Sequence, residues 1–219
     1  MTADSTFVLR ITLNGSKPPI WRRVAVRSDI TLGELHEVIQ IAMGWTDSHL
    51  HQFVLRDKSL KPYPQEMARR LQQDAWDPTL LDRMEGRRVF VTKVTPWGEP
   101  TEMDGEDERA VTLAEVCPKV KSKLIYEYDF GDGWEHTIEV QKIAEPEAGA
   151  AYPVCLEGKK ACPPEDCGGV WGYYELLKAV ADPDHEDHED MVEWLGEEFD
   201  PEALDLEEVN AILAEWRRG

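Results

Sequence analysis

The stretch that decides the fold is LIYEYDFGDGWEHTIEV, which spans Leu124 to Val140 near the middle of the chain. On either side of Gly131-Asp132-Gly133, every second residue is apolar or aromatic, which is the period of a strand with one buried face. The two glycines supply the positive backbone dihedrals that a tight connection needs. The sequence therefore predicts a β-hairpin at the centre of the fold.

A second hairpin is predicted at the start of the chain. Residues 7–13 alternate apolar and polar side chains, residues 14–19 contain the turn-forming Asn-Gly and Pro-Pro pairs, and residues 20–27 form another extended run.

A helix follows over residues 32–43. Thr31 and Glu34 have the spacing of a capping box, apolar residues recur at helical intervals, and Gly44 is a natural stop. Because a hairpin covered by a helix needs further strands to bury both layers, residues 49–56 are predicted to be the next strand.

Residues 57–109 carry a weak signal and are predicted to be an insertion. Within this segment Val89 to Val94 looks like a strand, whereas residues 99–108 are acidic and are expected to form a solvated loop.

The C-terminal part changes character after Glu145. A stretch rich in Pro, Gly and Cys is expected to be an ordered loop, and residues 170–219 a helical subregion whose last helix is capped by Asp205 with Glu208. We expect the chain, residues 1–219, to be one α+β domain. In it, an N-terminal hairpin and helix join a mostly antiparallel sheet with a central hairpin, followed by a helical tail.

The composition limits the classes of partner and compartment that fit this chain. The chain has 219 residues and 42% hydrophobic content, enough for a core, and its 24 basic against 44 acidic residues give a formal net charge of -20. Such a surface repels phosphate backbones, so nucleic acid is not expected as a partner. Neither a secretory signal nor an apolar run of membrane-spanning length is visible. We therefore expect a soluble cytoplasmic protein, in which the four cysteines are thiols or metal ligands.

Several motifs together resemble one family. The chain is similar to the plasmid pRiA4b ORF-3-like proteins, some of which are labelled insertion-element TnpR passenger proteins. The resemblance implies a mixed α+β fold and no established activity. The TnpR label suggests a recombinase, but no resolvase serine with its arginine cluster is present. The matching stretches are SKPPIWRR (16–23), GW (44–45), HLHQF (49–53), YEYDFGDGWEH (126–136), ACPPEDCGG (161–169) and GYY (172–174).

Three cysteines form one candidate metal site. Cys155, Cys162 and Cys167 are separated by six and four residues in the Pro- and Gly-rich stretch. Zinc suits three thiolates with a fourth ligand, because it would stabilise a segment that lacks its own core. The alternative is that they are small buried thiols. The fourth zinc ligand would be one of three residues, Cys117, His185 or His188.

A second candidate site lies around the central hairpin. Histidines two apart in a strand point the same way, and carboxylates at a hairpin tip can converge on them. Such a set suits a metal-dependent hydrolase, in which the cation lowers the pKa of bound water. The alternative is structural: a hydrogen-bonded core histidine at 136, and aspartates that bond backbone amides in the turn. The residues are His49, His51, Asp129, Asp132 and His136.

Two further features have open interpretations. Gly168-Gly169 and Gly172 precede a predicted helix and could cradle a phosphate, although a tight turn is the default. Aromatic side chains beside the motifs fit either a binding cleft or the core, depending on exposure. They are Trp21, Trp45, Trp134 and Trp171.

The leading hypothesis is a non-catalytic binding or interaction module for a protein or small ligand, with zinc on the cysteines as its metal-stapled form. The competing hypothesis is a metal-dependent hydrolase that uses the five His and Asp residues near the central hairpin.

Overall fold

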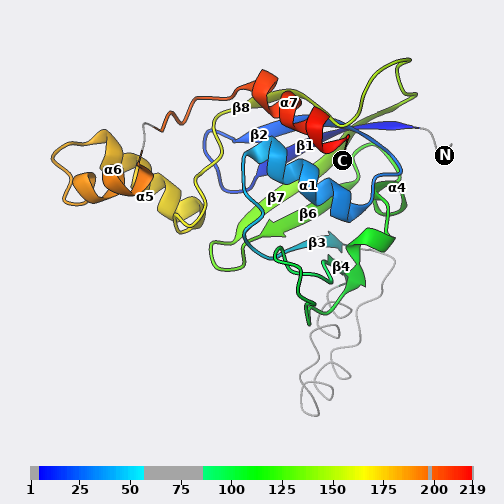
Figure 1. Cartoon of the computed structure of the whole chain (residues 1–219), viewed down its shortest axis with the longest axis horizontal. Helices are drawn as coiled ribbons and strands as arrows, with labels where there is room; N and C mark the ends of the chain where they lie inside the picture. The colour runs from blue at the N-terminus through cyan, green and yellow to red at the C-terminus, as the bar shows by residue number, and fades with distance from the viewer. Residues whose placement is uncertain (1–4, 57–85, 197–198, 219) are drawn as a thin grey trace, which may run out of the picture.

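The structure, a computed structural model, describes residues 5–56, 86–196 and 199–218. One eight-stranded sheet runs through it in the order β5-β4-β3-β6-β7-β1-β2-β8 (Figure 1). All neighbouring strands pair antiparallel except β4 and β5, which are parallel. The predicted α+β class with a mostly antiparallel sheet is confirmed. The strands are β1 (Thr6–Leu13), β2 (Trp21–Arg27), β3 (His51–Arg56), β4 (Arg87–Val91), β5 (Glu106–Asp107), β6 (Lys123–Tyr128), β7 (Trp134–Ala144) and β8 (Val154–Lys159).

The helices flank this sheet or extend from it. They are α1 (Leu32–Met43), the 3-10 turn η1 (Glu108–Ala110), α4 (Leu113–Val116), α5 (Gly169–Ala181), α6 (His188–Leu195) and α7 (Leu206–Trp216). In the described part of the chain, none of these helices combines the length and the apolar character that crossing a membrane requires.

The central hairpin is β6 paired with β7, with Tyr126 opposite His136 and Tyr128 opposite Trp134. These four side chains are fully buried, so the alternation in the sequence does face the core. The connection is longer than the predicted three-residue turn. It begins at Asp129, which has a positive φ of 53° and accepts a hydrogen bond from the Gly133 N–H.

Helix α1 begins and ends where its sequence predicts. The Thr31 side chain accepts from the Glu34 amide while the Glu34 carboxylate accepts from the Thr31 amide, and Gly44 closes the helix at φ 93°. One face of α1 packs on the sheet (Figure 1). That buried face also contains two polar residues, His36 and Gln40.

The segment predicted as an insertion lies partly outside the described residues, which omit 57–85. Its second part contains β4, which pairs with β3 and buries Phe90 and Val91, so these residues belong to the sheet. The expectation that residues 99–108 form a solvated loop is wrong for the last residue of that segment. Glu108 is only 2% exposed, because η1 folds it beneath α1 against His51.

The predicted ordered loop after Glu145 includes a strand. Residues 154–159 form β8, which pairs with β2 at the edge of the sheet and buries Cys155. Cys155 is the only fully buried residue of β8, and so the strand carries no clear period of two. Helix α7 docks on this edge through Asn210, whose side chain bonds both the amide and the carbonyl of Cys155.

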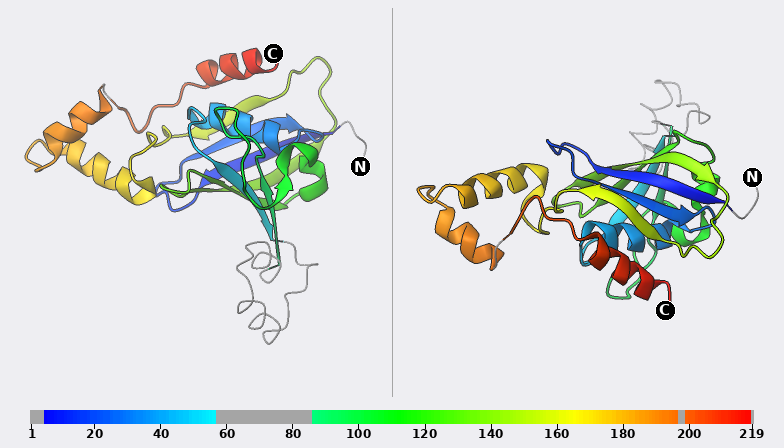
Figure 2. Two further views of the ribbon diagram at one scale, coloured as in Figure 1. Left: turned by 60° about the horizontal axis from the view of Figure 1, so that its bottom comes forward. Right: turned by 90° about the horizontal axis from the view of Figure 1, so that it is seen from above.

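The C-terminal helices lie in two different places relative to the sheet. Helix α7 folds back beside α1, where the Trp216 indole donates to Glu37. Helices α5 and α6 pack on each other and project away from the sheet (Figures 1 and 2). The Asp205 cap predicted for the last helix is present, because its side chain accepts from the amides of Glu207 and Glu208.

The start of α5 is packed backbone to backbone against the central hairpin. A Cβ at Gly169 would lie 2.2 Å from the Asp132 carbonyl oxygen, and the Gly168 amide donates to the Asp132 carboxylate at 3.1 Å. The hairpin tip therefore occupies the place that a phosphate would take, and the tight-turn interpretation of these glycines holds.

This contact predicts that Gly169→Ala is more damaging than strain alone explains. Gly169 and Gly149 both have positive φ, 69° and 78°, but nothing lies within 4 Å of a Cβ at Gly149. Gly149→Ala should lower the free energy of unfolding by about 1 kcal/mol, the cost of a left-handed alanine. Gly169→Ala should cost roughly 2 kcal/mol more, because the clash displaces α5 or the hairpin tip. Urea unfolding of both variants measures the difference, and equal losses would contradict the proposed contact.

Candidate functional site

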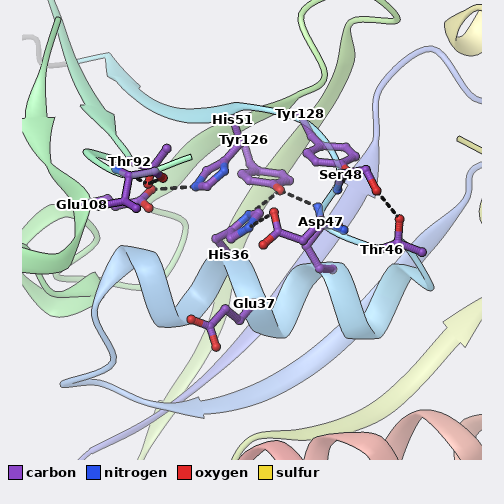
Figure 3. A network of polar contacts seen from close by, with 12 residues as sticks. His36, Glu37, Thr46, Asp47, Ser48, His51, Thr92, Glu108, Tyr126 and Tyr128 are labelled. Atoms are coloured by element: carbon purple, nitrogen blue, oxygen red, sulfur yellow. Dashed lines mark hydrogen bonds and ion pairs between the residues drawn. The ribbon is translucent and has the colours of Figure 1, made fainter. Parts of the chain in front are cut away.

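A cluster of polar side chains is enclosed between α1, β3, η1 and the central hairpin. His36 points from α1 toward the sheet, where it meets His51 at the start of β3 (Figure 3). His36 and Gln40 are four residues apart, so they lie on one face of the helix, and they are 4% and 3% exposed. The helix thus presents two polar groups to a largely apolar core.

The two imidazole rings are stacked. Their centroids are 3.5 Å apart and their planes differ by 4°. His36 Nε2 lies 2.9 Å from Asp47 Oδ1 and His36 Nδ1 lies 2.8 Å from the Tyr126 hydroxyl. His51 Nε2 lies 2.8 Å from Glu108 Oε2. Each ring is therefore oriented by a carboxylate.

The neighbouring residues hold these groups in place. The Gln40 amide donates to the Tyr126 hydroxyl at 2.9 Å, and its oxygen accepts from the Asp47 amide at 2.9 Å. Asp47 has a positive φ of 56°, which short polar side chains tolerate. Gly33 lets η1 approach α1, since a Cβ there would lie 3.0 Å from the Arg109 side chain.

One nitrogen of the cluster is free for a ligand. The His51 side chain is only 5% exposed, and its buried Nδ1 has no hydrogen-bond partner among the described residues. The residue His51 lines a pocket of about 130 Å³ together with His36, Asp47 and Glu108. His36, Asp47 and His51 each offer one ligand atom, and these atoms lie within 4.8 Å of one another. Imidazole and carboxylate groups are ligands that zinc and other divalent transition metals accept.

Burial controls the charge of this cluster. Desolvation lowers the pKa of His36, and the neighbouring His51 acts in the same direction, while the hydrogen bond to Asp47 partly opposes both. Desolvation also raises the pKa of the Tyr126 hydroxyl well above its usual value. His36 is therefore a neutral imidazole at neutral pH, which is the form that binds a metal ion.

A second, more exposed group lies at the hairpin tip. His49 Nε2 is 3.2 Å from Asp166 Oδ1 and 3.8 Å from Asp129 Oδ2, and these three residues also offer ligand atoms within 4.8 Å of one another. Their side chains are 27%, 70% and 11% exposed for His49, Asp166 and Asp129. Here the structure brings together two of the residues predicted from the sequence and adds Asp166.

The five residues predicted as one site are divided among different places. His49 and His51 do not point to a common site, because His51 begins β3 whereas His49 precedes the strand and turns toward the hairpin tip. The Asp132 carboxylate accepts from the Gly168 amide. His136 is fully buried beneath Trp45 and Tyr126, and neither of its ring nitrogens has a hydrogen-bond partner among the described residues.

The three cysteines predicted as zinc ligands lie along the β8 edge and the loop after it. Within the part of the chain that the structure describes, neither group of converging ligand atoms contains a cysteine. All four cysteines are free thiols. Burial raises the pKa of each thiol, to about 12 for Cys167 and Cys117, which disfavours the thiolate.

Sequence reasoning missed His36, Asp47 and Glu108. One signal was available: His36 and Gln40 place two polar residues beside the apolar stripe of a well-capped helix, which is unusual for a face that packs on a sheet. No local pattern identifies Glu108, because it resembles the acidic residues around it. It is distinguished only by the fold, which carries it next to His51, 57 residues away in the sequence.

The chain is similar to a protein-family model, to a protein of known sequence and to a solved structure. The family model described as plasmid pRiA4b ORF-3-like protein matches residues 5–208. The uncharacterized protein y4hQ of Sinorhizobium fredii (strain NBRC 101917 / NGR234) is 36% identical over 217 residues, covering 96% of this chain and 93% of that protein. The crystal structure of MM3350, a protein of unknown function from Methanosarcina mazei Go1, is similar with a TM-score of 0.73 and 31% identity. That match covers 94% of this chain and 98% of MM3350.

The burial of His136 predicts a loss of stability in acid. Burial lowers the pKa of His136 to about 3, because the charged ring would lose its hydration in the core. Above pH ~6.5 the imidazole is neutral in both the folded and the unfolded chain, so it contributes no pH dependence. Below that value the unfolded chain takes up a proton that the folded chain excludes, so the free energy of unfolding falls by up to ~1.4 kcal/mol per pH unit.

His136→Leu should remove this contribution. Between about pH 7 and pH 5, the variant should lose roughly 2 kcal/mol less than the parent in urea unfolding. His185→Leu is the matched control, because this imidazole is partly exposed beside α6. Parallel pH profiles for the parent and His136→Leu would contradict the interpretation.

Proposed function

We propose that this chain, which belongs to the plasmid pRiA4b ORF-3-like family, is a divalent-metal-binding module whose ion is held by His36, Asp47 and His51. One observation carries the proposal. The three residues offer ligand atoms within 4.8 Å of one another and line one small polar pocket, and the buried His51 Nδ1 has no hydrogen-bond partner among the described residues. Two imidazoles and a carboxylate suit Zn²⁺ and neighbouring first-row metals.

The second layer of contacts supports this assignment. Histidines that bind metals commonly use their other ring nitrogen to bond a carboxylate or another polar group, which fixes the tautomer and the ring orientation. Glu108 has this role for His51, and the Tyr126 hydroxyl has it for His36 Nδ1. With those contacts kept, His51 Nδ1 and His36 Nε2 are the nitrogens left for an ion, the latter in exchange for its contact with Asp47.

Charge balance also favours a cation. The Glu108 side chain is 3% exposed, and the Asp47 carboxylate, whose side chain is 42% exposed, lines the same pocket. A buried carboxylate requires a compensating positive charge, which either a proton on the imidazoles or a bound cation supplies. A divalent ion would compensate both carboxylates at once.

The size of the pocket favours binding over catalysis. At about 130 Å³ it is well below the ~300–1,000 Å³ typical of small-molecule sites. An ion with a water molecule fits, whereas an organic substrate does not. The ion would connect α1, the loop before β3 and β3 itself, so its binding energy would contribute to folding. This is the metal-stapled binding module expected from the sequence, with the metal on histidines in place of the cysteines.

Two other expectations stay proposals. We place the protein in the cytoplasm, a compartment consistent with its four free thiols. The metal-dependent hydrolase is the competing function, and the observation that favours it is the His49, Asp129 and Asp166 group, whose ligand atoms converge and in which Asp166 is 70% exposed.

Metal titration of the purified protein tests the proposal. Zn²⁺, with Co²⁺ as its spectroscopic substitute, should bind with one ion per chain at the buried site and raise the free energy of unfolding by about 2.7 kcal/mol at a hundredfold excess over Kd. His51→Ala and His36→Ala should abolish this binding. Glu108→Gln should weaken it by about tenfold or more, because it removes only the group that orients His51.

His49→Ala separates the two groups, and His185→Ala controls for adventitious histidine binding. If His49→Ala removes the metal while His51→Ala keeps it, the ion belongs to the exposed group and the hydrolase hypothesis gains. If the parent protein binds neither ion, or the Cys162→Ser variant alone loses it, the histidine site is wrong.

A further inference from the structure

The α5–α6 pair presents large apolar side chains to solvent. Trp171 on α5 is 77% exposed, and Trp194 on α6 is 47% exposed. Helix α6 has no buried residue, and the pair extends away from the sheet in every view (Figures 1 and 2). Both indoles line one pocket of about 410 Å³ between the two helices, which is large enough to accept a long side chain of a partner.

The rest of this α5–α6 pocket is acidic. Carboxylates of Asp166, Glu175 and Asp187 line it together with Met191, and no Lys or Arg is among its described lining residues. The sequence around this pocket also lacks basic residues, since no Lys or Arg occurs between Lys178 and Arg217. The local potential is therefore negative, within a protein whose formal net charge is -20.

The charged neighbours leave part of this acidity uncompensated. Lys178 pairs with Glu175 at 2.6 Å, and His49 approaches Asp166 at 3.2 Å. Asp187 is 58% exposed and lies 3.8 Å from His185 Nδ1. Asp187 begins α6 without a side-chain cap bond, so its carboxylate is available to a ligand.

We propose that the α5–α6 pocket binds a lysine or arginine side chain of a basic segment in a partner protein. The indole faces of Trp171 and Trp194 attract a cation through their quadrupoles, and the carboxylates add a direct charge interaction. Met191 and Leu176 offer apolar surface to the methylene stem of such a side chain. This inference is independent of the proposed metal site, because His36, Asp47 and His51 do not line the α5–α6 pocket.

The same features exclude other partners. Nucleic acid and anionic lipid surfaces are repelled by the carboxylates. An apolar partner helix would have to desolvate those carboxylates without pairing them, which is unfavourable. A cationic side chain is the ligand that satisfies both the aromatic and the acidic groups.

Binding of a defined peptide to the full chain tests this inference. The probe is an acetylated and amidated peptide of alternating lysine and glycine, and its companion has glutamine in place of lysine. Calorimetry should detect the lysine peptide alone, with an affinity that falls as salt is raised. In NMR spectra the indole N–H signals of Trp171 and Trp194 should shift, and that of Trp97 should not.

Paired variants identify the site. Trp171→Ala should weaken the lysine peptide by about tenfold. Trp97→Ala should leave it unchanged, although Trp97 is 67% exposed and so an equally accessible indole. Asp187→Asn should weaken binding by about threefold, whereas Glu193→Gln, which removes the same charge from the same helix outside the pocket lining, should not.

Three outcomes would overturn the inference. The lysine peptide does not bind, the glutamine peptide binds equally well, or the two control variants weaken binding as much as Trp171→Ala and Asp187→Asn. The last result would mean that the acidic surface attracts the lysine peptide non-specifically and that the α5–α6 pocket is not its binding site.

Discussion

The buried hydroxyl of Tyr126 is the constraint on which the arrangement of this protein depends. Tyr126 is fully buried on the inner face of the central hairpin, and a buried hydroxyl without a partner is costly. Its partners are His36 and Gln40 on α1. To satisfy this one group, α1 must keep two polar residues on its packing face and must sit in one rotational setting on the sheet. That setting places His36 against His51.

The second tyrosine of the hairpin ties the loops around the site to the same scaffold. The Tyr128 hydroxyl accepts from the Ser48 amide at 3.0 Å and donates to Glu165, whose carboxylate also accepts from Thr46. The loop before β3 and the loop before α5 are therefore fixed by one side chain. As a result, one hairpin side chain contacts both the loop that carries Asp47 and His49 and the loop that carries Asp166.

The two proposed binding places use the acidity of the chain in different ways. At the histidine cluster, the carboxylate of Glu108 is buried and must be compensated locally, which is the basis of the proposed binding of a small cation. At the α5–α6 pocket, the carboxylates are solvated and act over a longer range, which favours the capture of a basic segment. The backbone contact between Gly169 and Asp132 connects the projecting helices to the hairpin, so both places are built on the same element.

The sequence by itself determined the elements whose signals are local. The central hairpin, the capping box at Thr31, the stop at Gly44 and the Asp205 cap follow from alternation and short-range hydrogen bonds, and they were predicted correctly. Of the five residues that the sequence grouped as a candidate site, His49 and Asp129 lie 3.8 Å apart. Two placements depend on the tertiary structure alone. His51 lies with His36, Asp47 and Glu108, apart from His49, and Cys155 lies in a strand. The physical reason is that these contacts join segments that are far apart in the chain, and their energy comes from burial and polar satisfaction, which no local period encodes.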